Sequence, residues 1–172
     1  MKIWKTTAVG VAIALCASHA SAANYYLAAA NGEDSMFIAF DTLKSLSASR
    51  KRVWVIFTST EGSPAYKMAL EEYDCTEETD RNLSLIGYTD KGDVLFSGDQ
   101  PGPVRHVVPS SMGANVLTAV CDLETVEKRF MFRADNPLEL YKLIKELKSQ
   151  PPLNRAWHPR QLSSRSSNPT AP

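Results

Sequence analysis

The sequence contains little of the material from which catalytic and metal sites are usually built. Its 172 residues include only three cysteines and three histidines. It lacks the G-x-S-x-G turn of serine hydrolases, the glycine-rich loops that hold nucleotide phosphates, and a C-x-x-C-H haem attachment motif. A zinc site needs clustered cysteine and histidine side chains, and no such cluster occurs. We therefore expect no catalytic residue, no metal ligand and no cofactor.

A single histidine falls in the central part of the chain. In a hydrolase triad, His106 would need a nucleophilic serine and an orienting carboxylate beside it. The nearby Ser110 and Ser111 are more simply interpreted as caps of a helix that begins near Met112. An enzymatic alternative therefore rests on His106 alone.

Long apolar runs are also scarce, and the clearest one lies at the N-terminus. Lys2 and Lys5 precede an apolar segment at residues 8–17, and the sequence Ala-Ser-Ala occupies residues 20–22. This order is typical of a cleavable secretory signal peptide, which we predict for residues 1–22. The run is shorter than the roughly 20 apolar residues that a membrane-spanning helix needs. We expect no transmembrane segment in the mature chain.

Cys16 raises a different interpretation of the same segment. The signal of a bacterial lipoprotein ends at a cysteine that becomes acylated, and a small residue precedes that cysteine. Here the preceding residue is Leu15, and the Ala-Ser-Ala site lies beyond it. We favour cleavage after Ala22, with lipidation at Cys16 as the alternative.

Charge is unevenly distributed along the mature chain. Residues 23–148 carry 14 basic and 19 acidic residues, a net charge of −5, whereas residues 149–172 carry three arginines and no acid. A domain of this charge is a poor nucleic-acid partner, because phosphate contacts need a basic face. Residues 149–172 are also rich in proline and serine and poor in apolar residues, so we predict a flexible tail there. Residues 23–148 are expected to form one folded domain.

Two cysteines remain after the signal peptide is removed. They are Cys75 and Cys121. An even pair in an exported protein indicates a disulfide, because compartments outside the cytoplasm are oxidising.

Several segments have the pattern of β-strands. Continuous apolar runs at residues 36–40 and 53–57 are typical of strands covered on both faces. The segments 83–88 and 94–96 flank a glycine-containing connection and predict a β-hairpin. Residues 66–75 alternate like a strand but contain strong helix formers, and periodicity alone leaves their structure open.

Two helices are expected, at about residues 112–120 and 137–148. Asn136 is a good N-cap for the second helix, and Pro137 suits its first turn. One apolar stripe runs along this helix, and we expect it to pack on the sheet rather than bind a partner. The stripe consists of Leu140, Leu143, Ile144 and Leu147.

Two clusters of charge lie in the middle of the chain. The six acids between residues 71 and 80 lack the glycine and the spacing of an EF-hand, so we interpret them as a solvated acidic face that could attract a basic protein. Arg50, Lys51 and Arg52 are interpreted as a loop ahead of a strand, with contact to an anion as the alternative.

An ordered set of short motifs crosses the same region. They are R-V-W-V at 52–55, Y-D-C at 73–75, R-N-L-S-L at 81–85, V-P-S-S at 108–111 and V-C at 120–121. Together they resemble the surface-adhesin protein E family of Gram-negative bacteria, over roughly residues 24–122. The resemblance implies a small antiparallel sheet with a packed helix, a strand at residues 66–75, and pairing of Cys75 with Cys121. The named member of the family is an adhesin that binds host matrix proteins and is linked to haem.

The combined expectation is an α+β fold. It consists of a small antiparallel β-sheet with a short helix and a C-terminal helix packed on the sheet, closed by one disulfide. The expected function is that of an exported, non-enzymatic binding domain in the periplasm or at the cell surface, contacting a host matrix or envelope protein. The alternative is a periplasmic accessory or assembly factor whose acidic strand and basic tail contact other envelope proteins.

Overall fold

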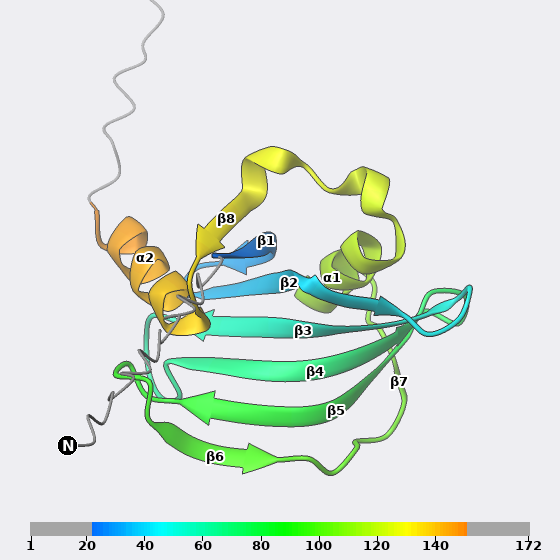
Figure 1. Cartoon of the computed structure of the whole chain (residues 1–172), viewed down its shortest axis with the longest axis horizontal. Coiled ribbons are helices and arrows are strands. Elements are labelled where there is room, and N and C mark those ends of the chain that lie inside the picture. Colours follow the sequence, from blue (N-terminus) through cyan, green and yellow to red (C-terminus); the bar gives the residue numbers. More distant parts are fainter. Residues whose placement is uncertain (1–21, 151–172) are drawn as a thin grey trace, which may run out of the picture.

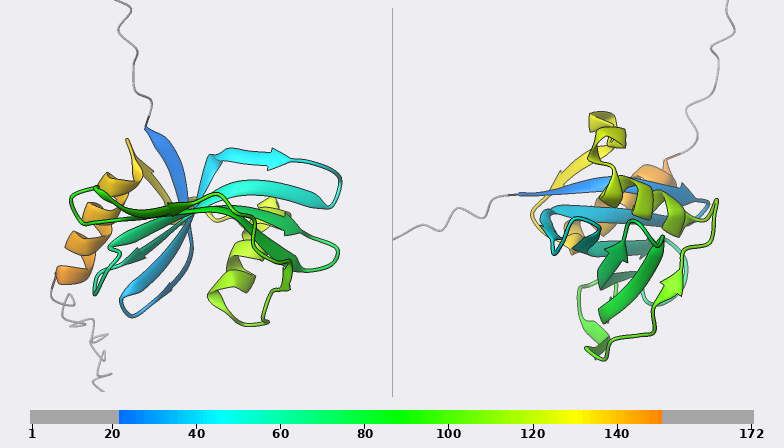
Figure 2. Two further views of the ribbon diagram at one scale, coloured as in Figure 1. Left: turned by 90° about the horizontal axis from the view of Figure 1, so that it is seen from below. Right: turned by 90° about the vertical axis from the view of Figure 1, so that its right-hand side faces the viewer.

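A computed structural model describes residues 22–150, which build one twisted antiparallel sheet with a helix on each face (Figures 1 and 2). Nearly all of the predicted signal peptide, and the predicted tail beyond Gln150, lie outside the described residues. No helix within the described part is long and apolar enough to cross a membrane. The strands are β1 (Ala23–Asn31), β2 (Asp34–Ser45), β3 (Arg50–Ser59), β4 (Tyr66–Asp74), β5 (Thr79–Tyr88), β6 (Val94–Gly98), β7 (Arg105–His106) and β8 (Met131–Ala134).

The helices are α1 (Met112–Cys121) and α2 (Pro137–Ser149), with two short 3₁₀ turns between α1 and β8 at Leu123–Thr125 and Lys128–Phe130. The strand order is β6-β5-β4-β3-β2-β1-β8, with β7 beside β5, and every neighbouring pair is antiparallel. The predicted α+β class and the hairpin between β5 and β6 are confirmed. Residues 66–74 form a strand, as the family resemblance implies.

The continuous apolar runs are explained by burial on both faces of the sheet. On one face Ile38, Val53 and Val55 pack against α1. On the other face Phe37 and Ile56 pack against α2. Figure 1 places α2 over one end of the strands and α1 over the opposite end, so each helix covers only part of its face. Part of each face is therefore left without a helix above it.

Helix α2 begins at the predicted cap but turns a different side to the sheet. The side chain of Asn136 accepts a hydrogen bond from the backbone N–H of Glu139, 3.0 Å away. The buried residues are Leu140, Tyr141 and Ile144, whereas Leu143 is 37% and Leu147 48% exposed. The prediction that the whole stripe packs on the sheet is wrong for these last two residues. Tyr141 takes their place because its ring stacks on that of Tyr66 in β4.

The disulfide joins the end of β4 to the end of α1. The sulfur atoms of Cys75 and Cys121 lie 2.03 Å apart. At the same place the ammonium group of Lys51 donates to the carbonyl oxygens of Val120 and Cys121, at 3.0 and 3.2 Å. A lysine suits the negative C-terminal end of a helix. These contacts fix α1 to one end of the sheet.

Candidate functional site

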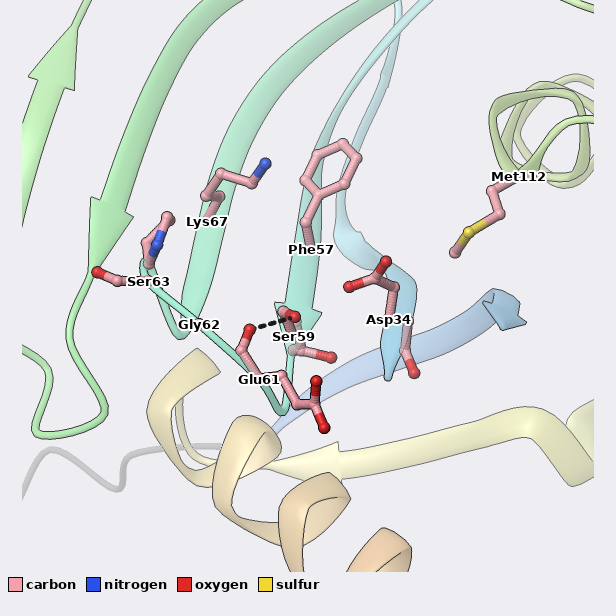
Figure 3. A pocket seen from close by; sticks show the side chains of 11 residues that line it. Asp34, Phe57, Ser59, Glu61, Gly62, Ser63, Lys67 and Met112 are labelled. Atoms are coloured by element: carbon pink, nitrogen blue, oxygen red, sulfur yellow. Dashed lines mark hydrogen bonds between the residues drawn. The ribbon is translucent and has the colours of Figure 1, made fainter. Parts of the chain in front are cut away.

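A cleft of about 380 Å³ opens on the face that carries α1, beyond the end of that helix (Figure 3). Phe57 of β3 and Lys67 of β4 project into it, and the Lys67 ammonium lies 5.5 Å from the centre of the Phe57 ring. Asp34, Glu61 and Met112 line its sides. The cleft is therefore mixed in character, with an aromatic wall, one cation and two carboxylates.

The described residues that line this cleft do not include a nucleophile with a base beside it. The hydroxyl of Ser59 donates to the carbonyl oxygen of Glu61 at 2.8 Å, which holds the loop between β3 and β4 (Figure 3). Neither histidine nor cysteine is among the described residues that line the cleft. General acid–base or nucleophilic catalysis needs such a pair within hydrogen-bond reach.

His106 lies in the short strand β7, which pairs with the first residues of β5, and its side chain is exposed. Asp80 and Ser111 border the same shallow pocket, as a triad would require. Both are already engaged: Asp80 binds Arg105 at 2.9 Å, and the Ser111 hydroxyl accepts the Ala114 N–H as the N-cap of α1. Within residues 22–150, His106 makes no side-chain hydrogen bond to either. The helix-cap interpretation of Ser111 is confirmed.

The basic cluster at residues 50–52 begins strand β3, so its interpretation as a loop is wrong. The strand register places Arg52 opposite Glu72 of β4, and Arg50 opposite Asp74. A terminal nitrogen of Arg52 lies 2.9 Å from Glu72, and Arg50 binds the other carboxylate oxygen. The hydrogen bond from Arg52 lowers the pKa of Glu72, and the contact with Arg50 lowers it further by a smaller amount. Cross-strand charge pairing extends the strand to this end.

The acidic stretch is not a solvated face over its whole length. Glu71 is only 5% exposed and Glu72 only 8% exposed. One oxygen of Glu71 accepts a hydrogen bond from Asn82 at 3.1 Å, and the other has no partner among the described residues. Burial raises the pKa of Glu71. No group of acids, histidines or cysteines in residues 22–150 is arranged to hold a metal ion.

Strand β6 forms an open edge of the sheet (Figure 1). All five of its residues are exposed, including Val94, Leu95 and Phe96. The Phe96 ring lies directly over Gly87 of β5, where an added Cβ would come within 2.4 Å of the ring and displace it. The sequence predicted this strand but gave no sign that it would lie uncovered.

Further exposed apolar residues follow β6 along the chain. Val104 and Val108, in the segment that leads to α1, are also exposed. Residues 94–108 thus hold five of the nine large apolar residues that are exposed in the described part of the chain. We call β6 with Val104 and Val108 the open edge. Exposed apolar surface of this kind commonly marks an interaction site.

Comparison with known protein families matches residues 25–122 to surface-adhesin protein E. The matched segment is more than half of the chain. The chain belongs to the surface-adhesin protein E family. No curated protein and no solved structure matches it. The adhesin match runs from β1 to the residue after α1, so it contains both cysteines, the cleft and the open edge, whereas β8 and α2 follow it.

Proposed function

We propose that this chain is an exported, non-enzymatic adhesin domain that binds a host matrix or envelope protein through its open edge. Membership of the surface-adhesin protein E family supports the adhesin role. We choose this surface because strand β6 is an uncovered edge strand, and its outer side presents unpaired backbone N–H and C=O groups. Protein partners commonly add a strand to such an edge, with backbone hydrogen bonds giving affinity and side-chain pockets giving specificity.

The composition of the open edge supports this role. Natural sheet edges are normally protected by charged residues, proline or bulges. Strand β6 has the sequence Val-Leu-Phe-Ser-Gly and contains no charge and no proline. The opposite edge strand, β8, is only four residues long, includes Arg133, and leads almost directly into α2. Of the two ends of the sheet, β6 is therefore the one suited to a partner.

Two further observations support export. Strand β1 begins at Ala23, the residue that follows the predicted cleavage site. The bond between Cys75 and Cys121 fits an oxidising compartment. The competing role as a periplasmic assembly factor invokes an acidic strand and a basic tail. Two of the acids, Glu71 and Glu72, are buried, and most of the tail lies outside the described residues.

Binding of the purified mature protein to immobilised matrix proteins tests the proposal. Leu95→Asp places a charge on the open edge, and Leu147→Asp is a matched control because Leu95 is 46% and Leu147 48% exposed. We expect Leu95→Asp to weaken binding by roughly tenfold or more, as for a residue central to an interface, and Leu147→Asp to bind like the parent. Equal binding by all three proteins would refute the assignment of the edge.

A further inference from the structure

The sheet face that packs against α2 carries a row of charged side chains in the part that the helix leaves uncovered. Strand register places Lys44 opposite Arg52, Arg52 opposite Glu72, and Glu72 opposite Arg81. Residues directly opposite one another share a face of the sheet. The row therefore crosses four strands, over about 14 Å at the usual spacing between strands.

This row has more positive than negative charge. Its one carboxylate, Glu72, is already bound by Arg52 and also by Arg50. Lys44 faces Arg52 across the strands, and like charges in that position repel. Within residues 22–150, the Lys44 side chain has neither a hydrogen-bond nor an ion-pair partner. Arg81 uses its Nε to donate to the carbonyl oxygen of Gly102 at 3.2 Å, and its terminal nitrogens have no hydrogen-bond partner among residues 22–150.

An apolar pair lies beside this row on the same face. Trp54 on β3 lies opposite Leu70 on β4. Trp54 is two residues along its strand from Arg52, and Leu70 is two residues along its strand from Glu72. Both are only half-buried. They line a pocket of about 380 Å³ together with Asp41, Thr42, Lys44 and Arg52. We call this the Trp54 pocket.

A bulge in β2 forms the side of the Trp54 pocket. The register between β2 and β3 shifts between Ala39 and Lys44. The Thr42 hydroxyl stabilises the bulge, since it accepts the Trp54 backbone N–H at 3.0 Å and donates to the Ala39 carbonyl at 2.7 Å. Bulges often redirect side chains at functional sites. Because of the bulge, Lys44 lies on the same face as Ala39 and Trp54, and Asp41 lines the same pocket.

Asp41 is held in its ionised form. The backbone N–H of Asn24 donates to its carboxylate at 2.7 Å and the Asn24 amide at 3.1 Å. These hydrogen bonds lower the pKa of Asp41. A fixed carboxylate can accept hydrogen bonds from hydroxyl groups. The pocket thus joins a flat aromatic surface, an acceptor for hydroxyls and two cations.

We propose that the Trp54 pocket and the charged row bind an acidic glycan, a polysaccharide that carries carboxylate or sulfate groups. The apolar face of a sugar ring would pack on the indole of Trp54. Ring hydroxyls would donate to Asp41, and the anionic groups would bind Lys44 and Arg52 by charge-assisted hydrogen bonds. This site lies on the sheet face, away from the outer side of β6, and so adds a second ligand to the proposed protein-binding function.

Single-stranded nucleic acid is the competing occupant, since it also stacks on aromatic side chains and binds cations. Two features favour the glycan. The Asp41 carboxylate would repel a phosphate but accept a sugar hydroxyl. Residues 23–148 carry a net charge of −5, which opposes a ligand with one phosphate per nucleotide more than a glycan whose charges are spaced further apart, such as hyaluronan.

Fluorescence titration of the mature protein tests this proposal. The signal peptide contains Trp4, so Trp157→Phe leaves Trp54 as the sole tryptophan of the mature chain. The probes are heparin, which is sulfated, hyaluronan, which carries only carboxylates, and an oligothymidylate. We expect heparin or hyaluronan to give a saturable change in Trp54 emission that added salt weakens. Because Lys44 is exposed, Lys44→Glu should keep the fold, which circular dichroism verifies, and reduce affinity roughly tenfold.

Lys91→Glu is the matched control, because Lys91 is an exposed lysine in the turn between β5 and β6. It should bind like the parent. Equal losses for Lys44→Glu and Lys91→Glu would mean general attraction between charges and would overturn the proposal. So would an absent response to both glycans, or oligothymidylate binding as tight as heparin binding. Adhesion through the open edge is measured separately with Leu95→Asp, so failure of one site leaves the other intact.

Discussion

Replacing Leu140 by alanine tests how α2 is held on the sheet. Leu140 is fully buried and packs in one cluster with Phe37, Ile56 and Ile144. Removing a buried leucine side chain costs about 2–5 kcal/mol, through lost transfer free energy and the cavity left behind. That is a large part of the roughly 5–15 kcal/mol by which a domain is stable. Leu140→Ala should therefore be strongly destabilising.

Leu143 is the internal control, because it lies on the same helix but is 37% exposed. Leu143→Ala should change the free energy of unfolding by about 0.5–1 kcal/mol, close to the range for surface substitutions. Urea unfolding followed by circular dichroism measures both, and the slope of the transition should stay near that of the parent. Equal losses for the two variants would refute the packing described here. So would a Leu140→Ala protein as stable as the parent.

Four other predictions follow from the same structure and sequence. Protein isolated from the periplasm should be lighter by two hydrogens than its reduced form, and Cys75→Ser should lose up to about 4 kcal/mol of stability; alkylatable thiols in the native protein would contradict this. Glu71→Gln should raise the melting temperature at neutral pH, because burial raises the pKa of the Glu71 carboxyl. The stability that the protonated Glu71 contributes is present below the usual carboxyl pKa and is lost as pH rises through the raised pKa. The gain should vanish near about pH 4, and exposed Glu77→Gln should show no gain at either pH. N-terminal sequencing should find Ala23 first, and an acylated Cys16 would contradict it. Truncation after Pro152 should leave the melting temperature nearly unchanged, whereas a large drop would mean that the removed segment stabilises the domain.

Structural features that depend on residues close together in the sequence could be predicted. The N-cap of α2 depends on Asn136 and the residues just after it, and the hairpin between β5 and β6 depends on a short glycine-containing turn. The apolar runs in β2 and β3 identified strands buried on both faces. Each of these signals is complete within about ten residues of chain.

Features set by distant partners were not predictable in the same way. Glu71 and Glu72 look like surface acids until Asn82, Arg50 and Arg52 are brought against them by strand pairing. The helix formers of β4 adopt a strand because β3 and β5 flank it on both sides. Local propensity is a weak preference that such tertiary pairing overrides.

The candidate binding surfaces depend on the same distant contacts. The Trp54 pocket requires the bulge in β2, and the bulge is stabilised by the contact of Thr42 with β3. Strand β6 is an open edge only because β8 returns to the opposite side, beside β1. The sequence indicated apolar residues and cations at these places without showing which would remain exposed.

Protease shaving of whole cells of the native host tests the adhesin role most directly. An antibody against residues 23–148 would follow the domain while a periplasmic marker reports on membrane integrity. A surface adhesin should lose its signal after protease treatment while the marker stays intact. If the domain is protected together with the marker until the outer membrane is opened, the protein acts inside the envelope, and the surface role proposed here is wrong.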